Sequence, residues 1–104
     1  IKNRQFERAL EILAPLSTEE KVKFDYFLWR GFALMGLGRY EEAKTNLLEG
    51  NKIYNSDTRL LNALGECFFR TGDRTRALEA LSASLKLNPN QPQVKKLLEE
   101  IQKK

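Results

Sequence analysis

A spacing that repeats at a fixed offset restricts the fold of this chain more than any other feature of its sequence. Gly31 and Gly65 lie thirty-four residues apart. The same offset relates four further pairs, Leu34 and Phe68, Gly38 and Gly72, Ala43 and Ala77, and Leu47 and Leu81. A period of this length indicates repeated supersecondary units, each of which packs only against its neighbours. The 104 residues can therefore fold without one large central core.

Apolar residues at spacings of three and four predict a helix for each half of these units. The predicted helices cover residues 5–14, 18–37, 40–53, 58–71, 74–87 and 92–104. Ser17 and Glu20 have the spacing of a capping box, and Asp57 and Asp73 suit the position just before a helix. Gly38 tolerates the left-handed conformation that often ends a helix. The chain is thus predicted to be all-α.

The last predicted helix differs from the others. Its apolar residues occur at i, i+3, i+4 and i+7, and they are Val94, Leu97, Leu98 and Ile101. This pattern gives a one-sided amphipathic helix, with lysines on the other face. Because terminal repeats need a polar outer face for solubility, we expect residues 92–104 to form a capping helix.

Two units can be written out from the repeated positions. The second reads Leu61-x2-Leu64-Gly65-x2-Phe68, then Ala77-x3-Leu81, then Pro89. The first reads Phe27-x2-Arg30-Gly31-x2-Leu34, then Ala43-x3-Leu47, with Asn55 where the proline would stand. Both resemble the tetratricopeptide repeat, a helix-turn-helix unit of 34 residues, although the first departs from it at Arg30 and Asn55.

The resemblance implies a domain organisation. A single domain of tandem helix-turn-helix repeats would form a right-handed α-solenoid. Its parts would be the second helix of a partial repeat at 1–16, full repeats at 24–57 and 58–91, and the capping helix at 92–104. Because the helix at 5–14 lacks the first helix of its own unit, we expect the parent protein to continue beyond this N-terminus.

The resemblance also implies a function. Tetratricopeptide arrays bind other proteins, and the first helix of each unit lines a concave groove that holds a peptide segment or a helix of the partner. The groove residues implied here are Leu28, Trp29, Phe32, Met35, Arg59, Asn62, Glu66, Phe69 and Arg70. Aromatic, methionine and arginine side chains are enriched at the centres of protein interfaces. Trp29 has a second interpretation, because a further repeat before it would bury it in the core.

Some relatives hold an acidic C-terminal tail in a clamp of lysine, arginine and asparagine side chains. A terminal carboxylate needs several converging donors once its water is removed. In this chain Trp29 and Ala63 occupy the column of the clamp asparagine. The pattern therefore does not favour a carboxylate clamp, and the partner-facing patch is predicted to be largely apolar.

The sequence gives less support to other classes of function. The chain has no histidine, no Gly-rich phosphate loop and no nucleophile with a visible base, so we expect no catalysis, metal or cofactor. Cys67 is interpreted as a packed thiol.

Residues 39–85 contain seven bases and seven acids, which argues against nucleic acid as a ligand. No apolar run reaches about 18 residues, so no membrane span is expected. The alternatives to a protein-binding scaffold are an accessory domain of a larger enzyme, a self-association module and a helical-repeat RNA binder.

Overall fold

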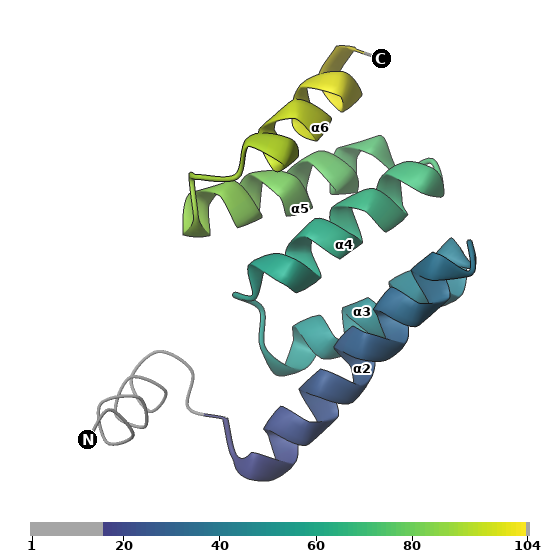
Figure 1. Cartoon of the computed structure of the whole chain (residues 1–104), viewed down its shortest axis with the longest axis vertical. Coiled ribbons are helices and arrows are strands. Elements are labelled where there is room, and N and C mark those ends of the chain that lie inside the picture. Colours follow the sequence, from purple (N-terminus) through teal and green to yellow (C-terminus); the bar gives the residue numbers. More distant parts are fainter. Residues whose placement is uncertain (1–15, 104) are drawn as a thin grey trace.

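The computed structural model describes residues 16–103, and all the regular structure in this range is helical. The helices are α2 (Thr18–Gly36), α3 (Tyr40–Ile53), α4 (Thr58–Arg70), α5 (Arg74–Leu87) and α6 (Pro92–Lys103). They stack in chain order, from the α2–α3 hairpin at one end, through the α4–α5 hairpin, to α6 at the other end (Figure 1). This arrangement confirms the predicted all-α fold of tandem helical hairpins. The helix predicted at 5–14 lies outside the described residues.

Local hydrogen bonds explain where the helices begin. The Ser17 hydroxyl accepts a bond from the backbone N–H of Glu20 at 3.1 Å, and the Glu20 carboxylate accepts one from the Ser17 N–H at 3.0 Å. This is the predicted capping box, and it satisfies two helix donors at once. The Asp57 carboxylate accepts bonds from the first N–H groups of α4 in the same way. The predicted starts of α2 and α4 are therefore confirmed.

The two hairpin turns depend on glycine. Gly38 and Gly72 have φ angles of 77° and 91°, a region that side chains with a Cβ rarely adopt. The preceding helices α2 and α4 end at Gly36 and Arg70, one residue earlier than predicted. Such a difference is within the ordinary fraying of a last turn.

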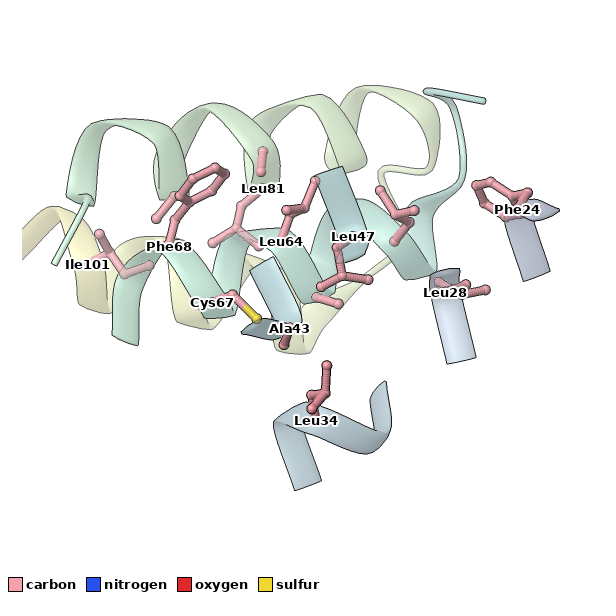
Figure 2. Packing of buried hydrophobic residues seen from close by; sticks show 14 residues of the cluster. Phe24, Leu28, Leu34, Ala43, Leu47, Leu64, Cys67, Phe68, Leu81 and Ile101 are labelled. Carbon is pink, nitrogen blue, oxygen red and sulfur yellow. The ribbon is translucent and has the colours of Figure 1, made fainter. Parts of the chain in front are cut away.

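Close approach of the two helices in each hairpin explains the repeated glycine and leucine positions. A Cβ placed on Gly31 would lie 2.5 Å from Leu47 Cδ2, and one on Gly65 would lie 2.6 Å from Leu81 Cδ2. Both leucines are completely buried. Figure 2 shows Leu47 and Leu81 among the buried side chains that form one cluster through the stack. The offset of thirty-four residues thus reproduces one packing contact in each hairpin.

Helix α6 covers the end of the stack, as predicted for a cap. Ile101 is fully buried, and Val94, Leu97 and Leu98 pack against the core from partly buried positions. The Arg74 guanidinium on α5 donates to the carbonyls of Ile101 and Gln102 at 2.9 and 3.2 Å. It thereby satisfies carbonyls at the C-terminal end of α6, where a positive charge is also favourable.

The N-cap carboxylates make the stability of the stack sensitive to acid. Burial alone would raise the pKa of Asp57, but its hydrogen bonds with Arg59 and with backbone N–H groups hold it below the ordinary 3.8. A hydrogen bond from the Arg76 side chain likewise lowers the pKa of Asp73. Because the unfolded chain takes up these protons more readily, the stabilisation by both caps is complete above about pH 4 and is lost as the pH falls through the lowered values.

We therefore expect Asp57→Asn and Asp73→Asn to flatten the fall in unfolding free energy between neutral pH and about pH 3. Asparagine still caps a helix, so the neutral-pH stability should change less than the acid response. Urea unfolding at several pH values measures both quantities. A double variant that loses as much stability on acidification as the parent chain would contradict this account.

No helix among residues 16–103 combines the length and the apolar character that crossing a membrane requires.

Candidate protein-binding surface

The predicted groove residues belong to α2 and α4, the first helices of the two hairpins, which pack against each other. On α2, Trp29 is 55% exposed although it is a large apolar side chain. Its ring meets the Phe32 ring edge to face, with centroids 5.3 Å apart. Phe32 and Met35 are partly buried against the core. We call Trp29, Phe32 and Met35 the aromatic patch; the exposed Trp29 ring and the partly buried side chains beside it offer an apolar surface.

Arg59 connects the aromatic patch to α4. Its guanidinium carbon lies 5.9 Å from the centroid of the Trp29 ring, within the range of a cation–π contact. The same guanidinium donates to both carboxylate oxygens of Asp57, at 3.2 and 2.8 Å. The bond to Asp57 raises the pKa of Arg59, so the arginine stays charged. Asp57 therefore both caps α4 and orients the arginine that stacks on Trp29.

The far end of α4 carries a second paired arginine. Arg70 lies 3.4 Å from the Glu66 carboxylate, one turn earlier on the same helix. Its guanidinium carbon is also 5.4 Å from the centroid of the Tyr40 ring on α3. Phe69 is partly buried beside it. Each charged predicted residue of α4 thus has a partner of opposite charge within the protein, in ion pairs whose arginines remain about half exposed.

Leu28 is a correction to the predicted surface. Its side chain is completely buried and belongs to the hydrophobic cluster in Figure 2, so it has no area to offer a partner. Adjacent helix positions point about 100° apart, which lets Trp29 remain exposed while Leu28 faces inward. Leu28 is a core residue, and the surface begins at Trp29.

Asn62 has a structural bond in this fold. Its amide donates to the Gln91 side-chain oxygen at 2.9 Å. The Gln91 amide in turn donates to Ser84 and Asn88 near the end of α5. This network holds the corner where the chain enters α6 and uses an amide N–H of Asn62, whereas Asn62 Oδ1 is buried without a hydrogen-bond partner among the described residues.

A cavity beside Arg59 was not anticipated from the sequence. It measures about 230 Å³, and its walls include Phe24, Tyr54, Asp25 and Asp57. Phe24 and Tyr54 meet edge to face there, with centroids 5.9 Å apart. The only sequence signal was Asp57 standing two residues before Arg59, which indicated a cap and not a cavity. Arg59 lines this cavity and also stacks on Trp29, so it lies between the cavity and the aromatic patch.

Cys67 does not contribute to this surface. Its side chain is fully buried, and burial together with the nearby Glu66 charge raises the pKa of the thiol to about 11. A thiol with so high a pKa stays protonated and unreactive at neutral pH. This agrees with the interpretation of Cys67 as a packed thiol.

Comparison with known proteins supports the architecture. A family model described as tetratricopeptide repeat matches residues 34–101, which is more than half of the chain. The structure of the Yersinia enterocolitica type III secretion chaperone SycD, in complex with a peptide of the translocator YopD, has a similar fold with a TM-score of 0.69. The two sequences are 22% identical, and the match covers 91% of this chain and 73% of the SycD chain. No curated protein matches the chain. The chain belongs to the tetratricopeptide repeat family of helical protein-interaction scaffolds.

Proposed function

We propose that the face formed by α2 and α4 binds a peptide segment or a helix of a partner protein, with the aromatic patch as its anchor point. The observation that carries this proposal is Trp29, which is more than half exposed yet held in place by Phe32 and Arg59. An exposed aromatic side chain that is already ordered loses little conformational freedom on binding. Tryptophan and arginine are also the residues most often found at energetic hot spots.

The charge pairing indicates what the partner segment offers. Arg59 is paired with Asp57, and Arg70 with Glu66. A terminal carboxylate would have to compete with these internal partners for donors. We therefore infer an apolar anchor, such as a leucine or phenylalanine side chain, that packs on the exposed surface of Trp29 beside the partly buried Phe32 and Met35. The peptide bound to SycD gives this proposal a precedent in a chain of similar fold.

Replacing Trp29 with alanine tests the proposal. The probe is a set of short, labelled peptides that each carry one leucine or phenylalanine in an otherwise polar sequence, measured by fluorescence anisotropy. We expect some of them to bind the parent chain and to bind Trp29→Ala at least about tenfold more weakly, the loss typical of a hot-spot aromatic. Circular dichroism establishes that the variant is folded.

Leu87→Ala is the matched control. Leu87 is a large apolar residue on α5 with 49% exposure, close to that of Trp29, but it lies outside the proposed surface. Its removal should leave peptide affinity unchanged. The proposal would be wrong if no anchor-bearing peptide bound the parent chain, or if Leu87→Ala weakened binding as much as Trp29→Ala.

A further inference from the structure

A hollow lies between α3 and α5, which both pack on α4. Its volume is about 600 Å³, enough for a long side chain of another molecule. Helix α4 lines it with Leu61, Leu64 and Phe68. Helix α5 adds Ala80 and Ala83, whose short side chains leave the hollow open. We call it the α3–α5 groove; none of its lining residues belongs to the aromatic patch.

The positive charges on the walls of the α3–α5 groove have partners within the protein. The Lys44 amine lies 3.0 Å from the Glu41 carboxylate and donates to the Thr71 hydroxyl at 3.1 Å. The Arg76 guanidinium lies 2.8 Å from the Asp73 carboxylate. An anionic ligand would have to compete with these partners for donors. The groove therefore does not favour a carboxylate or a phosphate.

Two acceptors on the same walls have no such partner. Glu79 on α5 makes no hydrogen bond and no ion pair within residues 16–103, and its charge acts on Arg76 only from beyond ion-pair distance. On α3, the side-chain oxygen of Asn51 is buried and lacks a hydrogen-bond partner in the same part of the chain. A buried acceptor without a partner lowers stability. The repeat does not require an amide here, because the offset of thirty-four residues relates Asn51 to Leu85.

We propose that the α3–α5 groove binds an arginine side chain of a partner protein. The aliphatic stem of this arginine lies on the apolar residues of α4, and its guanidinium donates to the Glu79 carboxylate and to the Asn51 oxygen. Arginine carries five N–H donors and no acceptor, which matches a site with two unused acceptors. Long charged side chains bury their methylene stems on apolar surface while the charged group stays in polar surroundings. The residues of the groove thus specify both ends of one side chain.

The shape of the guanidinium favours arginine over lysine. The planar fork of arginine can donate to a carboxylate and to an amide oxygen at the same time, whereas a lysine amine is a compact and strongly hydrated point charge. Asn51 is partly exposed, so a small rotation of its amide presents the oxygen to an entering donor. This inference concerns a different surface from the proposed peptide site and does not depend on it.

Peptides with a single arginine test the proposal. The probe is a set of short peptides that each carry one arginine and no large apolar residue, so that they lack the anchor proposed for the aromatic patch. A matched set has citrulline, which keeps the shape of arginine but has no charge. NMR titration of the full chain detects binding even when it is weak. We expect some arginine peptides to bind, and their citrulline counterparts to bind at least about fivefold more weakly, the loss that corresponds to removing one partly exposed ion pair.

Three variants locate the binding. Glu79→Gln should weaken it at least about fivefold, and Glu100→Gln, which removes an exposed carboxylate of α6, is the matched control and should leave it unchanged. Asn51→Leu should also weaken binding, while the stability of the chain stays the same or rises because the buried acceptor is gone. Circular dichroism establishes that each variant is folded.

The proposal would be overturned if no arginine peptide bound the parent chain, or if the arginine and citrulline sets bound equally well. Equal affinity of Glu79→Gln and Glu100→Gln would overturn it as well. So would a dimer of the chain, detected by sedimentation, that Glu79→Gln dissociates, because the groove would then belong to a second copy.

Discussion

Replacing Leu81 with alanine is expected to lower the free energy of unfolding by about 2–5 kcal/mol, the range for large-to-small changes at fully buried positions. Leu81 has no exposed area and packs on Gly65, where α4 and α5 approach closely. The neighbouring glycine has no side chain that can move into the space, so a cavity should remain. For a domain of this size, each kcal/mol corresponds to roughly 4–8 °C in Tm.

Thermal and urea unfolding measure this loss, and Leu87→Ala serves as the reference. Both changes remove the same atoms from α5, but Leu87 is 49% exposed at the end of the helix. Its substitution should cost well under half as much as that of Leu81. If the two variants were equally stable, the contact between Leu81 and Gly65 would not be a main source of stability in this hairpin.

The fold could be predicted from the sequence because the same packing contact recurs at a fixed offset. Gly31 with Leu47 and Gly65 with Leu81 require a small and a large residue at the same two places in each hairpin. The helix starts were equally readable, since Ser17 and Asp57 bond to backbone groups only two or three residues away. A helix cap depends on residues close together in the chain, and the packing contact depends on a pair of residues that recurs at a fixed offset. Both can be read directly from a sequence.

The surface was less predictable, because exposure depends on what covers each helix. Leu28 and Trp29 are adjacent apolar residues, and spacing alone does not say which one the rest of the fold buries. Pairing is also hidden in the sequence: Arg59 could have faced a ligand freely, but the cap geometry of Asp57 holds it across Trp29. The Asn62 amide similarly donates to Gln91, twenty-nine residues away. Long-range side-chain partners of this kind leave no periodic pattern.

The proposed function places specificity and stability in different residues of the same helices. The helical glycine, alanine and leucine positions that recur between the two hairpins are buried and stabilise the packing of the helices. The aromatic patch, by contrast, occurs on α2 alone. At its offset positions α4 has Ala63 and Glu66 in place of Trp29 and Phe32. A partner segment that recognises this protein would therefore distinguish one repeat from the next by these departures from the pattern, and substitutions there should change binding more than stability.

Gly65→Ala is the second substitution expected to lower the free energy of unfolding substantially. It would do so by overpacking the contact, whereas Leu81→Ala leaves a cavity there. The new methyl group would lie 2.6 Å from Leu81 Cδ2 and 2.7 Å from its Cγ, and Leu81 is too enclosed to move aside. Overpacking of this kind costs about 1–3 kcal/mol, which exceeds the gain of up to about 1 kcal/mol from the helix preference of alanine. A net loss of unfolding free energy should therefore appear in urea titrations.

Gly36→Ala isolates the helix-preference effect, because the Cβ that it adds at the end of α2 has no atom within 4 Å apart from its chain neighbours and the backbone of its own helix. It should leave stability unchanged or raise it slightly. The double variant Gly65→Ala/Leu81→Ala should lose less than the sum of the single losses, since the smaller side chain at position 81 leaves room for the new methyl group. Strict additivity would mean that the two residues do not share one contact. The repeated glycine would then need an explanation in backbone conformation, yet its φ is not among the positive values in this fold.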